Sequence, residues 1–377
     1  MNIFDSLEAL LITNSTNIRY LTGFVGVAPE EREAYLLLTQ DAIFLFTNAL
    51  YLESTKNLKS QISMTKQGAI TVIEISRENP LAKKLATILM SVIPGPTRNP
   101  SYLKTGSRLK GRDDKYGIKL GFEETDLTVA EFGKLKDELG GIRLIPTKNR
   151  IENLRMIKRE DEIENIRQAA KITDECFDFI IGKIKPGVTE SEIAWEIESF
   201  FRQRGAQTAF SPIVAFGKNS SMPHYRTSET RLRTSDIILL DFGARVNGYC
   251  SDMTRVVFVG KPKDEWKRAY EVVLKAQTVA LNNIHNNPDK LSREVIKKAG
   301  FPPYPHSLGH GVGLAIHEQP RLSYKNPSAR LRAGMVVAIE PAIYKEGRYG
   351  IRIEDLVLLK KDGVEILSKS PKKLLII

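Results

Sequence analysis

Histidines gather in one short part of the chain. Three of the five histidines, His306, His310 and His317, lie within twelve residues in the glycine-rich segment PHSLGHGVGLAIHEQP. Imidazole side chains bind metal ions and transfer protons near neutral pH, so this cluster could do either. Separate loop histidines with no common role are the alternative, and the acidic residues help to decide between the two.

Two aspartates are predicted to converge in a β-hairpin. Asn247-Gly248 is a strong signal for a two-residue hairpin turn, and strand-like segments flank it. With that turn, Asp241 faces Thr254 and Asp252 faces Gly243. Asp241 and Asp252 are then diagonal neighbours on one face of the hairpin, close enough to act on a shared ion.

Two glutamates are predicted to face each other in a second hairpin. Glu340 and Glu354 are equidistant from Gly347, so a loop centred on that glycine would place them nearly opposite each other. The segments VVAIEP and IRIEDLVLL around them are apolar, as is IILLDFG in the first hairpin. Buried like charges repel and lose their hydration, so positive charge must lie between the four carboxylates.

Two divalent cations fit this charge. Four carboxylates balance two dications, and one imidazole adds a neutral ligand, whereas four acids would overcharge a single cation. Pairing with Arg245, Arg255 or Arg352 stays an alternative for individual carboxylates. GHGVG does not have the GxGxxG spacing of a phosphate loop, and we interpret the glycines beside His310 as letting the backbone approach the ions.

The elements that must position these residues divide the chain into two domains near residue 150. Residues 1–150 alternate strand-like runs with helical ones such as TVAEFGKLKDEL, which predicts an α/β domain. In residues 151–377 the helices and the antiparallel strands are segregated, which predicts an α+β domain. A length of 377 residues agrees with two domains.

The helices of the second domain are predicted from their start signals. A long helix is expected from Met156, and a second one follows the capping box formed by Thr189 and Glu192. A later helical pair is expected over 264–284 and 292–299.

Composition and charge exclude several classes of protein. Two cysteines are too few for a disulfide scaffold or a Cys-rich zinc module and favour a reducing cytoplasm, and no signal peptide or membrane span is recognised. The net charge of +11 raises nucleic acid as a partner. The densest basic stretch, 104–119, is interrupted by Asp113 and Asp114 and has no aromatic ladder, so a solvated face is favoured and no nucleic acid is expected.

The carboxylates and one histidine carry a family resemblance. Five segments, in chain order, resemble those of the metal ligands in the pita-bread metallopeptidases, the family of aminopeptidase P, prolidase and methionine aminopeptidase: Asp241 in LLDFGA, Asp252 in GYCSDMTR, His310 in LGHGVGL, Glu340 in IEPAIY and Glu354 in RIEDLVL. The opening LLITNSTNIRYLTGF is similar to the creatinase-type N-terminal domain that aminopeptidase P and prolidase carry. The resemblance implies a pita-bread domain preceded by a smaller α/β domain.

The resemblance also implies a role for each ligand. Asp241 would bind one metal ion, His310 and Glu340 would bind the other, and Asp252 and Glu354 would bridge the two. Glu340 would in addition take a proton from the attacking water. Manganese is the first choice among the cations, with cobalt and zinc as alternatives, because carboxylate-rich ligation suits them and availability decides.

Further residues match positions that contact the substrate in this family. His224, in SSMPHYR, and His317, in AIHE, match two catalytic histidines, and His306 matches a pocket histidine. Arg352 is expected to contact the substrate as well. Arg321, in EQPRLS, corresponds to an arginine that binds the substrate carboxylate in short prolidases.

The expected function is hydrolysis of the Xaa-Pro bond by a dimetal enzyme that acts as a cytoplasmic homodimer. Arg321 favours a dipeptidase, because a guanidinium at the proline carboxylate selects substrates that end there. An Xaa-Pro aminopeptidase acting on longer peptides is the alternative. A catalytically inactive pita-bread binding module and a creatinase-like hydrolase are disfavoured, because such relatives do not keep this ligand set.

Overall fold

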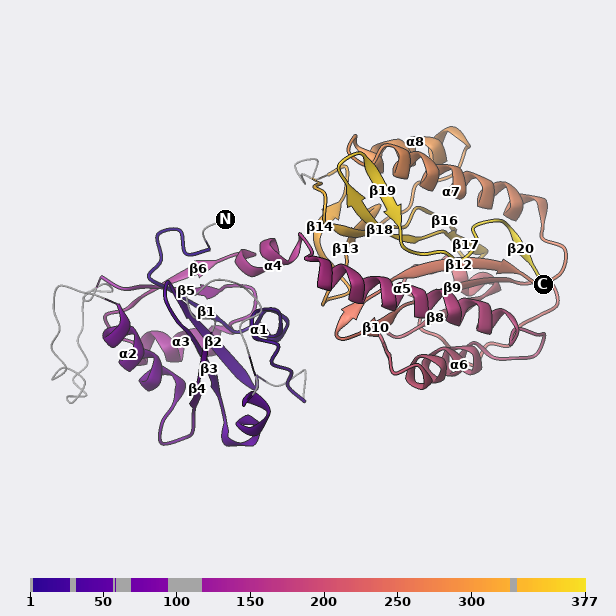
Figure 1. Ribbon diagram of the computed structural model, residues 1–377. Helices are drawn as coiled ribbons and strands as arrows, with labels where there is room; N and C mark the ends of the chain where they lie inside the picture. The colour runs from indigo at the N-terminus through magenta and orange to yellow at the C-terminus, as the bar shows by residue number, and fades with distance from the viewer. Residues whose placement is uncertain (1–2, 28–31, 57, 59–68, 94–116, 326–330) are drawn as a thin grey trace. The chain divides into compact units, whose positions relative to one another are not determined.

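The computed structural model describes residues 3–27, 32–56, 58, 69–93, 117–325 and 331–377 (Figure 1). Most of the basic stretch noted above, from Lys104 to Lys115, lies outside the described residues. The chain forms two compact units, Met1–Glu152 and Asn153–Ile377. Each unit has its own hydrophobic core, so each is described by itself.

The first unit is built on a six-stranded mixed sheet. Its strand order is β4-β3-β2-β1-β5-β6, with antiparallel pairs in the middle of the order and parallel pairs toward both ends. The strands are β1 (Ala9–Ile12), β2 (Ala34–Thr39), β3 (Ile43–Thr47), β4 (Ile70–Glu74), β5 (Lys119–Glu123) and β6 (Arg143–Thr147). Strands alternate with helices along the chain, as the α/β pattern of the sequence predicted.

Side-chain caps begin two helices of the first unit. Asn14 caps the first helix and Gly23 ends it with φ 76°, while Thr128 and Glu131 form a capping box on the third. Buried leucines from the second and third helices pack on the sheet. The helices are α1 (Ser15–Thr22), α2 (Leu81–Val92) and α3 (Val129–Glu138), with short 3₁₀ turns η1 (Ala49–Tyr51) and η2 (Glu53–Thr55).

Long helices frame the second unit. Thr189 and Glu192 form the predicted capping box, but the long first helix begins at Glu160 instead of Met156. Arg159 is extended, and its N–H donates to Glu162, so the helix starts after it. The helices are α4 (Arg150–Arg155), which spans the boundary, α5 (Glu160–Ile181), α6 (Glu190–Gln203), α7 (Asp264–Asn282) and α8 (Pro288–Lys298), with the 3₁₀ turn η4 (Gly217–Ser221).

Sheets of the second unit lie between the two helix pairs, with α7 and α8 on one side and α5 and α6 on the other (Figure 1). The sheet orders are β20-β12-β9-β8, β14-β13-β15-β18-β19, β11-β10-β7 and β16-β17. The strands are β7 (Gln207–Thr208), β8 (Ile213–Phe216), β9 (Ile237–Phe242), β10 (Ala244–Val246), β11 (Tyr249–Cys250), β12 (Met253–Phe258), β13 (Gly309–Gly311), β14 (Glu318–Leu322), β15 (Val336–Ile339), β16 (Ala342–Lys345), β17 (Tyr349–Arg352), β18 (Asp355–Lys360), β19 (Gly363–Ile366) and β20 (Leu375–Ile376).

Strand β9 carries Asp241 into the core of the second unit. Ile238 and Leu240 pack in the cluster that contains α5 and α6, whereas Ile237 and Leu239 pack in the cluster that contains α7 and α8. Because side chains alternate along a strand, Asp241 shares the face of Ile237 and Leu239.

Within the described residues, no helix combines the length and the apolar character needed to cross a bilayer.

Candidate metal centre

The first predicted hairpin has the register that its turn requires. Asn247 and Gly248 both have positive φ, at 49° and 87°, as a type I′ turn demands. Strand β9 pairs with β12 so that Asp241 faces Thr254, and β10 pairs with β11 in the continuing register. The prediction that Asp241 faces Thr254 is confirmed.

The second hairpin is centred on Gly347, also as predicted. Ala342 in β16 faces Arg352 in β17, and Ile339 in β15 faces Asp355 in β18. Glu340 and Glu354 lie between these two ladders, where the shared register makes them opposite each other.

His310 enters the centre from the middle strand of three. It lies in β13, which pairs with β14 and β15 and bulges between His310 and Gly311. A Cβ at Gly309 would lie 1.8 Å from the carbonyl oxygen of Ala338, and one at Gly311 would lie 2.2 Å from that of Gln319. The glycines therefore let neighbouring strands approach one another around His310.

Four of the five predicted ligands meet around the His310 ring. Ligand atoms of Asp252, His310 and Glu354 lie within 4.8 Å of one another. Nε2 of His310 is 3.6 Å from an Asp252 oxygen and 3.8 Å from a Glu340 oxygen. Nδ1 of His310 lies 3.1 Å from the Gly311 carbonyl oxygen, which orients the ring and directs Nε2 at the carboxylates.

The fifth residue, Asp241, is joined to the centre through Arg352. The Arg352 guanidinium donates to Asp241, and its Nε donates to Thr254, whose hydroxyl in turn donates to Glu354 over 2.6 Å. Arg352 also donates to Tyr344, at 2.7 Å, so at least three neighbours hold it in place. Its pairing with Asp241 is the arginine alternative that the sequence left open.

The other two arginines, Arg245 and Arg255, form no ion pair with the side chain of a predicted ligand among the described residues. Arg255 forms its ion pair with Asp355, and its Nη1 donates to the backbone of Glu354. Arg245 donates to the backbone carbonyl of Ala209. Arg352 is therefore the arginine whose positive charge partly compensates the carboxylates of the centre.

Burial and mutual repulsion act on the carboxyl groups of the centre. Burial, followed by the charge of Glu354, raises the pKa of Asp252 and of Glu340 well above the usual range. Burial and the charge of Asp241 raise the pKa of Glu354 to about 7. Burial also raises the pKa of Asp241, although Arg352 opposes the shift.

These observations fit a pair of divalent cations. One guanidinium faces four carboxylates, so as anions the carboxylates need further positive charge. Oδ1 of Asp241 is buried and has no hydrogen-bond partner among the described residues, which suits a metal ligand. Carboxylate oxygens with one imidazole nitrogen are a donor set for Mn²⁺, Co²⁺ or Zn²⁺.

Two further histidines lie against residues of the centre, and a third, His224, acts on it electrostatically. Nδ1 of His306 lies 3.8 Å from a Glu340 oxygen, and the ring of His317 packs edge-on against His310 with centroids 4.5 Å apart. Burial lowers the pKa of His317, and the charge of exposed His224 lowers it further. Burial lowers the pKa of His306 and of His310 to about 4, so both rings are neutral at pH 7.

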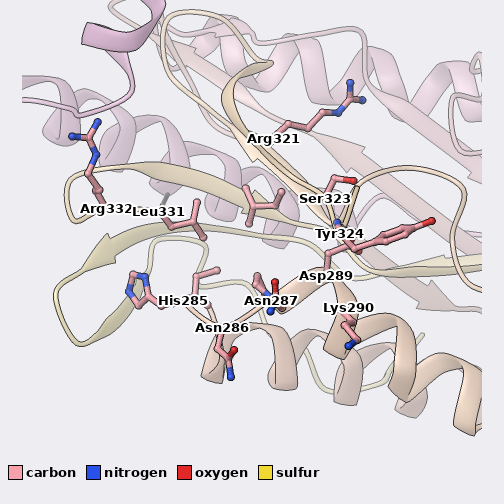
Figure 2. Close-up of a pocket in the computed structure, with 13 residues that line it drawn as sticks. His285, Asn286, Asn287, Asp289, Lys290, Arg321, Ser323, Tyr324, Leu331 and Arg332 are labelled. Carbon is pink, nitrogen blue, oxygen red and sulfur yellow. Dashed lines mark hydrogen bonds between the residues drawn. The ribbon is translucent and has the colours of Figure 1, made fainter. Parts of the chain in front are cut away.

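Arg321 lies beside the centre and at the edge of a cavity. It faces His310 across β13 and β14, its side chain is exposed, and its Nε donates to Ser307 over 3.3 Å. The cavity, of about 460 Å³, is lined by the loop before α8 and the end of β14. Figure 2 shows the Arg321 side chain extending away from His285 and Asn287 of that loop.

Two supporting residues were missed by reasoning from the sequence. Thr254 orients Glu354, and Tyr344 accepts from Arg352. The register had already placed Thr254 opposite Asp241, so its hydroxyl was a signal that could have been used. Tyr344 gives no comparable signal, because its contact depends on how the second hairpin packs on the first.

Comparisons with known proteins identify the family of the chain. The chain matches metallopeptidase family M24 over residues 164–361 and the creatinase/prolidase N-terminal domain over residues 5–157. The first match spans more than half of the chain, so the chain belongs to metallopeptidase family M24. The expected architecture, an α+β pita-bread domain preceded by a smaller α/β creatinase-type domain, is confirmed.

Relatives and solved structures extend the likeness over both units. An Xaa-Pro dipeptidase of Pyrococcus furiosus is 38% identical over 69% of this chain and 73% of its own length. The structure of an Xaa-Pro dipeptidase from Bacillus anthracis superimposes with a TM-score of 0.84, at 34% identity, and covers 99% of this chain and 97% of that one. An X-Pro aminopeptidase structure from Thermotoga maritima gives 0.79 at 31% identity, with 99% and 98% covered.

Proposed function

We propose that this chain is a two-metal peptidase that hydrolyses Xaa-Pro dipeptides. The observation that carries the proposal is the meeting of Asp252, His310, Glu340 and Glu354 in one buried cluster, with Asp241 joined to it through Arg352. Relatives named Xaa-Pro dipeptidase that are similar along the chain support the choice of substrate.

Each ligand has a proposed place in the centre. Asp241 would bind one cation, His310 and Glu340 would bind the other, and Asp252 and Glu354 would bridge the two. Two divalent cations held there supply positive charge that polarises the scissile carbonyl and activates a water molecule. We propose Mn²⁺ as the native cation, because oxygen ligands predominate.

Proton transfer falls to side chains of the chain. Glu340 is proposed to take the proton of the attacking water, since it lies in the cluster and remains partly exposed. The bond to proline has no N–H, and its nitrogen must gain a proton before it leaves. His224 and His317 are proposed to contact the scissile bond and to act on this proton or on the developing oxyanion.

Substrate contacts are proposed for three residues at or beside the centre. His306 and Arg352 are proposed to line the pocket. Arg352 donates N–H groups to Asp241, Thr254, Pro223 and Tyr344, which hold its guanidinium in place beside the centre. Arg321 is proposed to bind the proline carboxylate, which its exposure beside His310 supports.

The setting of the enzyme is also a proposal. We propose a cytoplasmic homodimer, and two buried cysteines that are both free support a reducing compartment. Light scattering at micromolar concentration tests the dimer. A fully active monomer would contradict it.

The decisive experiment loads purified protein with Mn²⁺ and compares an Xaa-Pro dipeptide with the matching Xaa-Ala dipeptide and Xaa-Pro-Yaa tripeptide. The proposal expects preferential cleavage of the Xaa-Pro dipeptide. Faster cleavage of the tripeptide would instead make the protein an aminopeptidase. Absence of both metal uptake and turnover would favour a binding module.

Arg321 gives a sharper test of the substrate class. Amidating the proline carboxylate removes a charge-assisted contact of roughly 1.5 to 3 kcal/mol, or about 10- to 150-fold in kcat/KM. The Arg321→Ala variant should lose this preference for the free acid over the amide. Equal losses on both substrates would assign Arg321 to structure.

A further inference from the structure

A buried carboxylate in the first turn of α6 has no part in capping that helix. Glu190 is fully buried and directly follows the N-cap residue Thr189. The capping box is completed by Thr189 and Glu192, whose groups bond to each other. The Glu190 side chain is therefore held in the interior by other contacts.

Those contacts come from the loop that carries His224. We name residues 217–230 the His224 loop. Oε1 of Glu190 accepts from the amide nitrogen of Phe216, just before the loop, at 2.7 Å, and from Asn219 at 2.9 Å. Oε2 accepts from the Tyr225 hydroxyl at 2.8 Å and from the Ser228 hydroxyl and amide at 2.8 and 3.1 Å.

Glu190 thus joins the two ends of the loop, on both sides of His224. All five of these donors are neutral groups, so the carboxylate must remain an acceptor to satisfy them. Its charge lies in the first turn of a 14-residue helix, where the helix dipole favours an anion. An amide at this position would direct an NH₂ group at donors and break part of the network.

Neighbouring contacts join the same loop to α6 and to β17. The backbone amide of Glu190 donates to Thr230 over 3.1 Å, and Gly350 of β17 donates to the Ser220 hydroxyl over 2.8 Å. Arg352 of the metal centre donates to the carbonyl oxygen of Pro223, which precedes His224. The loop is therefore held between α6 and the metal centre.

We infer that Glu190 is a positioning residue, which fixes the His224 loop so that His224 reaches the substrate at the metal centre. The inference rests on the proposed function, because that function gives His224 its role. His224 itself is exposed, so its position depends on the loop that carries it. Small displacements of a group at the reacting bond cost up to about 10²-fold in rate.

The first test measures the loop without using activity. Hydrogen exchange is compared between wild type, Glu190→Gln and the matched control Glu192→Gln, which keeps a capping residue on the same helix turn. In Glu190→Gln, the amides of Phe216 and Ser228 should exchange faster, while Mn²⁺ content stays at the wild-type value. Unchanged exchange in that variant would overturn the inference, even if the protein proved not to cleave Xaa-Pro peptides.

The second test is a double-mutant cycle with His224→Ala. Glu190→Gln alone should lower kcat by about 10- to 100-fold with metal content unchanged. In the His224→Ala background the same change should alter the remaining activity by less than about twofold, because the two residues act as one unit. A purely structural role would give equal losses in both backgrounds.

The outcomes separate the inference from the function on which it rests. Full activity of His224→Ala would overturn the role of His224 and with it this inference. Normal loss in His224→Ala with additive effects of Glu190→Gln would overturn the inference alone. If Glu190→Gln fails to fold, the Tyr225→Phe and Ser228→Ala double variant removes two donors and replaces it in both tests.

Discussion

Two regions of the second unit bury carboxylates in opposite electrostatic settings. In the metal centre, four carboxylates face one guanidinium, and burial with mutual repulsion raises the pKa of Asp252 and Glu340. Beside His317, Glu318 is equally enclosed but pairs with Arg155 and with Lys158, at 3.1 Å. Burial alone would raise the pKa of Glu318, yet Lys158 and Arg155 together lower it.

These two settings differ in whether the chain itself supplies the positive charge that its buried carboxylates need. Glu318, Arg155 and Lys158, which we name the Glu318 anchor, contain two cations for one carboxylate, so the chain itself supplies the charge that compensates Glu318. The metal centre has a deficit of positive charge that its own residues do not fill. A cluster of buried carboxylates therefore indicates a cation site when too few positively charged side chains surround it.

Asp252→Asn should impair the protein more than any other variant proposed for the comparison. This change removes a proposed bridging ligand, so both cations should bind more weakly and turnover should fall by orders of magnitude. Elemental analysis and an Xaa-Pro assay measure the two quantities. Asp362→Asn, in the exposed turn between β18 and β19, is the control and should behave as wild type. Two tightly held ions with normal turnover in Asp252→Asn would disprove the dimetal assignment.

The registers of the metal centre were open to prediction because turn geometry is local. Asn247-Gly248 requires a two-residue turn, and Gly347 has the positive φ that its loop demands. Once each turn is placed, the pairing of Asp241 with Thr254 and the opposition of Glu340 and Glu354 follow by counting along the strands. The fold class followed in the same way, from the order of the helical and strand-like runs.

The contacts that support the centre were not open to prediction. Asp241 pairs with Arg352, whereas Arg255 pairs with Asp355, and nothing in the sequence distinguishes these two arginines. The bonds of Glu190 span 26 to 38 residues, so they appear only when the elements pack. Sequence patterns describe single elements and their turns, but hydrogen bonds between elements depend on tertiary structure.

Glu318→Gln tests the Glu318 anchor, the region in which the buried carboxylate is paired. Glu318→Gln leaves Arg155 and Lys158 as buried charges without their carboxylate, which typically costs about 3 to 5 kcal/mol. Urea unfolding followed by tryptophan fluorescence measures the cost in this unit, because Trp195 and Trp266 are the two tryptophans of the chain.

Glu365→Gln provides the control for Glu318→Gln. Its carboxylate pairs with Arg167 at a partly exposed site, so its loss should cost no more than about 1 kcal/mol. Equal costs for the two variants would mean that the Glu318 anchor has no special electrostatic role.

Metal addition should stabilise the same unit through the metal centre. Mn²⁺ at about 100 times its dissociation constant should raise the free energy of unfolding by about 2.7 kcal/mol, because a ligand of the folded state shifts the equilibrium. The same titration on Asp252→Asn should give a smaller shift, whereas Glu318→Gln should respond as wild type. A shift of equal size in Asp252→Asn would place the bound ion elsewhere.

The smallest effect is the pH dependence of the stability that the Glu318 anchor provides. It is only a part of the difference in free energy of unfolding between wild type and Glu318→Gln. Lys158 and Arg155 lower the pKa of Glu318 in the folded state below its usual value of 4.5. The stabilisation is therefore complete above that value and is lost as the pH falls through the lowered pKa, because the unfolded chain binds the proton first. Urea unfolding at pH 7 and at steps below pH 5, with metal removed by a chelator, should show the wild-type advantage over Glu318→Gln shrinking toward acid pH. An advantage that stays constant down to pH 3 would show that the carboxylate acts through packing instead of charge.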